Sequence, residues 1–121
     1  MFFKKKYESV SMSEVKKMKN ISIIDVRSKE EFSKGSMPGA KNIEMNGLIL
    51  NSEVFLDFNK TYYILCQSGG RSSMVCDNLS KKGYKVINIS GGMNSYCKWL
   101  TFYWNEGIIY RIIKWKNFLL L

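Results

Sequence analysis

Three short apolar runs constrain most strongly the fold that this chain can adopt. They are ISIIDV (21–26), TYYILC (61–66) and YKVINI (84–89), and β-branched and aromatic residues dominate them. Runs of this length and composition are typical of strands that are buried on both faces. Because stretches with helix-like patterns separate them, the sequence predicts an α/β protein with a mostly parallel sheet and helices on both faces.

Two further segments complete a predicted five-stranded sheet. YESVS (7–11) alternates as a short strand does, and SMPGAKNI (36–43) reads as a turn that leads into a strand. The chain has 121 residues and one proline, so no linker marks a boundary between two domains. We therefore expect one hydrophobic core.

The helices are predicted from their start and stop signals. Ser11 precedes Glu14 by three residues, and Ser28 precedes Glu31 by the same spacing. This is the spacing of a capping box, so short helices should begin near residues 12 and 29. Apolar spacing and glycine positions predict three more helical segments. They are 46–58, 71–83, which ends at Gly83, and 91–100, which begins with a glycine turn.

Composition excludes several kinds of chemistry. The chain has no histidine, which rules out Ser-His-Asp and Cys-His devices. Its three cysteines, Cys66, Cys76 and Cys97, lack the C-x-x-C spacing of structural zinc sites, so no metal is expected. A thiolate nucleophile remains available, because once deprotonated it needs no partner to take up its proton.

Charge and cysteine content suggest partners and a compartment. The formal net charge of +9 favours anionic partners but does not choose among nucleic acid, a membrane surface and small anions. We expect no nucleic-acid role, since no basic and aromatic binding element is recognisable outside the last 20 or so residues. An odd cysteine count, a start (MFFKKKYES) without a signal-peptide core, and no apolar run of about 18 residues predict a reducing, cytoplasmic setting.

The stretch LCQSGGRSS (65–73) is the strongest candidate for a functional site. Cys66 ends a predicted parallel strand, and ligands in such sheets bind beyond the carboxyl ends of the strands. Gly69 and Gly70 allow successive amides to turn inward as an anion nest, and a helix begins near Arg71. One helix end contributes only about 0.3–1 kcal/mol at an exposed site. Several converging amides and a charge such as Arg71 must therefore act together on the sulfur.

Each cysteine has two possible roles, one in packing and one in chemistry. Cys66 is either a core cysteine or a nucleophile, and the glycine pair with the helix start favours the nucleophile. Cys76 lies inside the predicted helix, and Cys97 adjoins aromatic residues; we interpret both as packing residues.

Three charged residues have similar alternatives. Arg71 either binds substrate or holds the loop through a salt bridge. Asp25 and Arg27 share one side of a strand end. They either line the site or belong to a structural ion-pair cluster with Glu30 or Glu31, and we favour the cluster.

Three segments together resemble the rhodanese (sulfurtransferase) family. IIDVRSKEEFSKGSMPGAKNI (23–43) is similar to the first signature of that family, ILCQSGGRSS (64–73) to its active-site loop, and GYKVINISGGMNSYCKW (83–99) to its closing strand and glycine turn. The resemblance implies a rhodanese-like three-layer fold over residues 1–100. In one position the chain departs from the pattern, because Ser36 stands where many relatives carry histidine.

The resemblance also implies a mechanism and a set of site residues. Cys66 would be the catalytic cysteine, taking sulfur from thiosulfate or a related persulfide donor as a persulfide and passing it to a thiol or an acceptor protein. No metal or organic cofactor is implied. The spacing from Cys66 to Arg71 is C-x4-R, whereas related phosphatases and arsenate reductases use a wider C-x5-R loop. The substrate-binding residues would be Gln67, Ser68, Gly69, Gly70, Arg71 and Ser72.

The chain continues beyond the part that resembles the family. LTFYWNEGIIYRIIKWKNFLLL (100–121) is aromatic, aliphatic and basic, and we interpret 101–121 as a helix-like extension. A helix packed on the domain is the first interpretation, and a membrane-surface helix or a partner-binding face are the others. The extension supports an alternative function, a non-catalytic rhodanese-like binding or regulatory module that docks to a protein or membrane.

Overall fold

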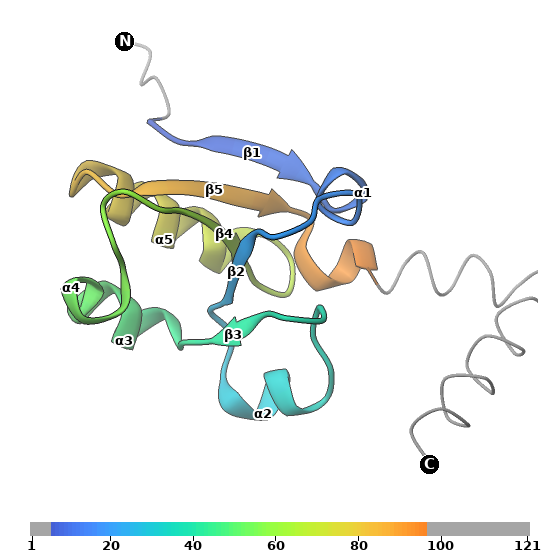
Figure 1. Cartoon of the computed structure of the whole chain (residues 1–121). Coiled ribbons are helices and arrows are strands. Elements are labelled where there is room, and N and C mark those ends of the chain that lie inside the picture. The colour runs from blue at the N-terminus through green and yellow to red at the C-terminus, as the bar shows by residue number, and fades with distance from the viewer. Residues whose placement is uncertain (1–5, 97–121) are drawn as a thin grey trace, which may run out of the picture.

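A five-stranded parallel sheet forms the centre of the protein. The computed structural model describes residues 6–96, and the strand order in the sheet is β1-β5-β4-β2-β3 (Figure 1). All four strand pairs are parallel, which confirms the predicted α/β class. The strands are β1 (Glu8–Ser11), β2 (Ser22–Asp25), β3 (Lys41–Asn42), β4 (Thr61–Leu65) and β5 (Lys85–Ser90).

The helices begin near the predicted positions, with one difference. The predicted helix over 46–58 is two shorter helices, because Asn51 leaves helical geometry at φ −127° and ψ 37°. Its backbone and side-chain N–H groups both donate to the Gly47 carbonyl, which ends the first of the two. The helices are α1 (Met12–Val15), α2 (Lys29–Ser33), α3 (Met45–Leu50), α4 (Ser52–Phe55) and α5 (Gly70–Lys81), and residues 92–96 are also helical.

Local signals account for several helix ends. At α2, Ser28 and Glu31 make both bonds of a capping box. At α1, the structure gives one of the two bonds, from the Glu14 N–H to Ser11 Oγ at 3.2 Å. At the far end of α5, Gly83 has φ +98°, the left-handed geometry that a glycine stop provides.

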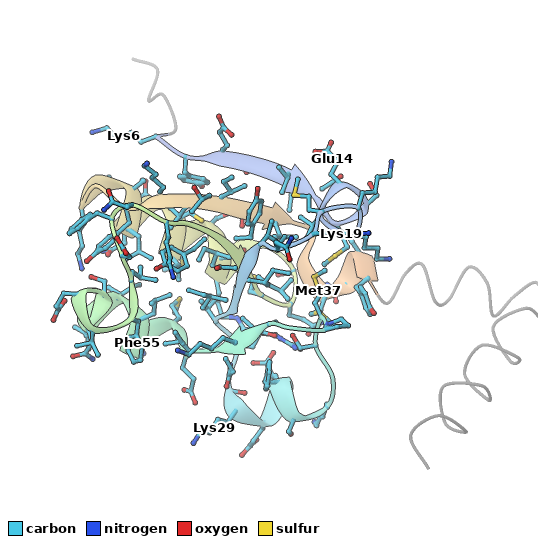
Figure 2. All side chains as sticks on the ribbon, viewed as in Figure 1. Lys6, Glu14, Lys19, Lys29, Met37 and Phe55 are labelled. Atoms are coloured by element: carbon cyan, nitrogen blue, oxygen red, sulfur yellow. The ribbon has the colours of Figure 1, made fainter. Side chains whose placement is uncertain are left out.

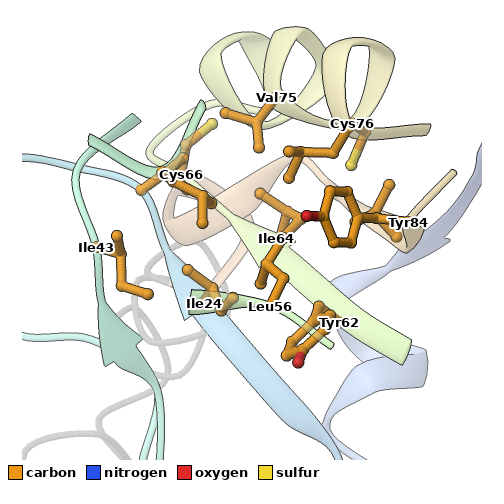
Figure 3. Close-up of a cluster of buried hydrophobic side chains, with 13 residues drawn as sticks. Ile24, Ile43, Leu56, Tyr62, Ile64, Cys66, Val75, Cys76 and Tyr84 are labelled. Carbon is orange, nitrogen blue, oxygen red and sulfur yellow. The ribbon is translucent and has the colours of Figure 1, made fainter. Parts of the chain in front are cut away.

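The two faces of the sheet bury separate apolar clusters. On the α5 face, Ile64 of β4 and Cys66, the residue after β4, belong to a cluster that includes Val75 and Leu79 of α5 (Figure 3). On the other face, Leu65 packs in a second cluster beneath α1 and the helical turn at 92–96. The buried members of this second cluster are Met12, Val15, Ile23, Met37, Leu65, Ile89 and Met93. Charged side chains such as Lys19 and Lys29 point outward (Figure 2). The result is the predicted three-layer arrangement.

The topology puts Cys66 at the centre of the carboxyl edge of the sheet. Its strand, β4, lies between β5 and β2. The N–H of Val26 donates to the Leu65 carbonyl at 2.9 Å, so the ends of β2 and β4 are held side by side. Residues that come directly after these two strands are therefore brought together.

Some predictions concern residues that the structure does not describe. The domain boundary at residue 100, the extension 101–121, Cys97 and the end of the predicted last helix all lie outside residues 6–96. Within that described range, no helix is both long enough and apolar enough to cross a membrane.

Candidate active site

The loop after β4 folds around the sulfur atom of Cys66. The backbone N–H of Gly69 donates to Cys66 Sγ at 3.0 Å, and that of Ser72 donates to it at 3.3 Å. Ser72 Oγ lies 3.2 Å from the same sulfur. Gly69, at φ +103°, is the residue that caps α5, and this left-handed geometry turns its amide toward the sulfur. The sulfur atom thus lies in a cradle made of two backbone N–H donors and the Ser72 hydroxyl, which accepts from the thiol and donates to the Gly69 carbonyl.

The first turn of α5 supplies two more donors. In an α-helix the first N–H groups have no intrahelical acceptor. Within residues 6–96, the structure gives no acceptor for the N–H groups of Gly70 and Arg71, which adjoin the Ser72 N–H in the same turn. The helix end also carries partial positive charge, so this turn suits an anion next to Cys66.

Cys66 is enclosed. Its exposed fraction is 0%. Its side chain belongs to the apolar cluster on the α5 face, as Figure 3 shows. The sulfur itself has polar neighbours from the loop, so it is not surrounded by hydrocarbon alone. Ser68 and Gly70 are exposed and form the outer surface of the loop. In this conformation of the loop, Cys66 has no surface exposed to solvent.

Arg71 holds the loop against α2. Its Nη1 and Nη2 donate to Oε1 and Oε2 of Glu31 at 2.7 and 2.8 Å, a bidentate pair in which both side chains are about a third exposed. The Arg71 hydrogen bond lowers the pKa of Glu31 from its ordinary value of 4.5 to about 2. The guanidinium is therefore engaged by a carboxylate, and its charge is largely compensated.

We expect Glu31→Gln to reduce the dependence of stability on acid. The folded-state pKa of Glu31 is depressed, so its contribution is complete above pH 4.5 and is lost as the pH falls toward about 2. Because the pair is partly exposed, the contribution is about 1 kcal/mol or less. Urea unfolding at pH 7 and pH 3 measures this contribution to the free energy of unfolding. Arg71→Gln and the double variant complete a double-mutant cycle for the pair. An equal pH dependence in Glu31→Gln and the parent would contradict the assignment.

Asp25 and Arg27 form a buried pair with each other, not with Glu30 or Glu31 as we expected. Arg27 Nη2 donates to Asp25 Oδ2 at 2.8 Å, and the exposed fractions of the two side chains are 4% and 0%. Residues far apart in sequence complete the network: the carbonyl of Gly35 accepts from Arg27 at 2.7 Å, and Ser36 Oγ donates to Asp25 at 2.6 Å. Ser36, the residue at which the motif departs from the resemblance, therefore makes a polar contact here.

This network reaches the loop through Gln67. Arg27 Nη1 donates to Gln67 Oε1 at 3.0 Å, and Gln67 Nε2 donates to Asn94 Oδ1 at 2.7 Å. Both ends of the Gln67 amide are thus held. The structure brings Asp25 and Arg27 to the base of the loop, and it directs neither of them at the sulfur.

Sequence reasoning missed the second wall of the site, the turn at 91–94. The N–H groups of Met93 and Asn94 donate to the carbonyls of Cys66 and Gln67 at 2.9 and 2.8 Å. Gly92, at φ +52°, approaches so closely that a Cβ there would overlap the Cys66 carbonyl. The adjacent glycines of SGGMN were the available signal, because paired glycines often mark a close backbone approach.

Cys76 is a packing residue in this structure. Its exposed fraction is 0%, and it lies one turn beyond Ser72 on the buried side of α5. Burial raises the pKa of its thiol to about 12, so it is protonated at neutral pH. Within residues 6–96, no group of three or more potential ligands is placed to hold a metal ion.

Comparison with known proteins shows the family. The model of the rhodanese-like domain matches residues 11–98, so the chain belongs to the rhodanese-like domain family. YtwF of Bacillus subtilis, provisionally named a sulfurtransferase, is 40% identical over 74 residues, which are 61% of this chain and 71% of YtwF. YrkF of the same organism, provisionally named a sulfur carrier protein, is 37% identical over 64% of this chain and 42% of its own length.

A solved structure agrees with the fold. The rhodanese-like domain protein of Staphylococcus aureus is 34% identical, with a TM-score of 0.68 over 74% of this chain and 90% of that protein. The family and the three-layer fold expected from the motifs are thereby confirmed. The chain spans less than half of YrkF, so what that whole protein does is not carried over from the match.

Proposed function

We propose that this protein is a sulfurtransferase that carries a sulfane sulfur on Cys66 as a persulfide. The Cys66 thiolate attacks the outer sulfur of a donor, a new S–S bond forms, and the S–S bond of the donor breaks. With thiosulfate, sulfite leaves with the bonding electron pair. A thiophilic acceptor then attacks the outer sulfur, and the Cys66 thiolate is the leaving group. Neither step requires a histidine, a metal or an organic cofactor.

The cradle around Cys66 Sγ is the observation that carries the proposal. Two backbone N–H groups, those of Gly69 and Ser72, already donate to the sulfur. The N–H groups of Gly70 and Arg71 are available for the second, negatively charged sulfur of a persulfide. In this role Gln67, Ser68, Gly69, Gly70, Arg71 and Ser72 bind through the loop backbone, while Asp25 and Arg27 position it.

Enclosure of Cys66 adds a requirement to the mechanism. Because the exposed fraction of Cys66 is 0%, the loop must move to admit the donor. Movement of this exposed part of the loop leaves the side-chain hydrogen bonds of Gln67 and Arg71 in place, but it breaks the bond from the Gly69 N–H to Cys66 Sγ until the loop closes again. We therefore place the opening at 68–70, between two anchored residues.

The proposed donor and acceptor follow from the charge of the protein and from the chemistry of the persulfide. Thiosulfate or a small persulfide fits a site built for one added sulfur, and the net charge of +9 favours anions at long range. A thiol or a sulfur-acceptor protein in the cytoplasm is the proposed destination, since the related YrkF is named for sulfur carriage. Contact with a membrane surface or a protein through 101–121 is a separate proposal.

Turnover with a defined donor and acceptor tests this function. We expect the full chain to form thiocyanate from thiosulfate and cyanide, with a rate that saturates in both. A persulfide donor such as glutathione persulfide is the second arm. Turnover with either donor supports sulfur transfer. If a chain whose fold is intact by circular dichroism shows turnover with neither donor, the sulfurtransferase proposal is contradicted and the non-catalytic module is favoured.

A further inference from the structure

An apolar groove lies on the face of the sheet opposite α5. Its volume is about 550 Å³, and apolar side chains of the second cluster form its floor. Figure 2 labels Met37, one of the residues at this place. The lining residues come from α1 and the loop after it, from β2, from the turn before β3 and from the last described turn: Val15, Lys16, Met18, Asn20, Ile21, Ile23, Met37, Pro38, Gly39 and Tyr96.

The position of Tyr96 identifies an occupant from the same chain. Tyr96 is the last residue that the structure describes, and its ring is one wall of the groove, with Lys16 Nζ 4.7 Å from the ring centre. Trp99 comes three residues later. A chain extends at most about 3.6 Å per residue, so Trp99 lies within about 11 Å of Tyr96 in any conformation. The part of the chain that the structure describes therefore ends at the groove.

The composition of the residues that follow Tyr96 matches the groove. CKWLTFYW (97–104) has one charged residue, Lys98, and two tryptophans. An indole ring buries about 150–250 Å² of surface when it is covered, and a run this apolar is an aggregation hazard if it stays in water. The groove floor is continuous with the second cluster, so a ring placed there would extend an existing core.

We propose that residues 97–104 fold back on their own domain and that Trp99 occupies this groove. The segment then covers Ile21, which is partly buried, and the remaining exposed surface of Met37, which is almost wholly buried. The proposal concerns a docking surface and does not depend on sulfur transfer. For the residues that it shares with the extension 101–121, it agrees with the first of the three interpretations, a helix packed on the domain, and not with a membrane-surface helix.

Tryptophan fluorescence can test this because of where the tryptophans lie. All three, Trp99, Trp104 and Trp115, belong to residues 97–121, so none comes from the described domain. A full-length chain with Trp104→Phe and Trp115→Phe reports on Trp99 alone. We expect its emission to be blue-shifted at nanomolar concentration and its quenching by acrylamide to be at least about threefold weaker than in the urea-unfolded chain, as for a largely buried ring.

A matched pair of variants tests the groove itself. Met18 lines the groove, is half-buried and lies outside both core clusters, whereas Met74 is 62% exposed on α5 and lines no part of it. Met18→Glu should red-shift Trp99 emission and restore most of its quenching, and Met74→Glu should change neither. Met18→Gln serves as the milder change if Met18→Glu does not fold by circular dichroism.

Three results would overturn the proposal. The first is a shielded Trp99 that neither substitution at Met18 affects. The second is a Trp99 that is exposed in buffer and becomes shielded only with phosphatidylglycerol vesicles, which would assign the segment to a membrane surface. The third is shielding that disappears on dilution together with a dimer, which would assign the groove to a second copy of the chain.

Discussion

Replacing Cys66 with serine will reduce thiocyanate formation to the uncatalysed background. The hydroxyl introduced by Cys66→Ser would occupy the same cradle and accept from the N–H groups of Gly69 and Ser72, but an oxygen nucleophile cannot form the persulfide. Because the cradle stays satisfied, the free energy of unfolding should change by only about 1 kcal/mol. The measurement is initial rate against thiosulfate concentration, alongside urea unfolding.

The matched control is the other described cysteine. Cys76 is equally buried, but its thiol has a pKa raised to about 12 and lies away from the loop amides. Cys76→Ala should therefore retain the turnover of the parent while losing some stability through the cavity it leaves. Turnover that persists in Cys66→Ser, or that is lost in a folded Cys76→Ala chain, would contradict the assignment of the nucleophile.

Gly92→Ala should be the most damaging change of a single methyl group. The added Cβ would overlap the backbone carbonyl of Cys66, and the left-handed φ of +52° adds about 1–2 kcal/mol of strain. Relief requires the turn at 91–94 to separate from the loop, which sacrifices two backbone hydrogen bonds worth about 1 kcal/mol each. We expect a loss of at least about 3 kcal/mol in the free energy of unfolding.

Activity should fall further than stability alone explains. The turn holds the carbonyls of Cys66 and Gln67, so its displacement moves the cradle, and a misplacement of about 1 Å can cost about a hundredfold in rate. Gly47→Ala is the control, since a Cβ at Gly47 meets nothing within 4 Å and the residue lies inside α3. That variant should be as stable as the parent or more so. Equal stability and turnover for Gly92→Ala would show that the turn does not support the site.

Local patterns in the sequence were sufficient to predict the sheet and the loop. The runs at 21–26, 61–66 and 84–89 became β2, β4 and β5 with shifts of about one residue at their ends. The loop residues are contiguous and their glycines have a direct geometric meaning, so the position of Cys66 beside the start of α5 could be predicted from a single stretch. The interruption at Asn51 was missed, because no glycine or proline marks it.

Long-range partners could not be predicted in the same way. Arg71 pairs with Glu31, which is 40 positions away, and Arg27 reaches Gln67 at the same separation. Which carboxylate a given guanidinium meets depends on how α2 packs against the loop, and charge patterns along the chain do not encode this. The glycine pair at 91–92 indicated a close backbone approach, but its partner, the loop after β4, depends on the adjacency of β4 and β5 and could not be identified from the sequence.

A persulfide on Cys66 can be detected directly by the mass of the intact protein. The protein is treated briefly with thiosulfate, and the excess is removed before the measurement. We expect the native chain to gain the mass of one sulfur atom, cyanide to remove it, and the same gain to appear in Cys76→Ala and not in Cys66→Ser. If a native, folded chain gains no sulfur from either thiosulfate or a persulfide donor, or gains it in the absence of Cys66, then Cys66 is not the residue that carries the sulfur.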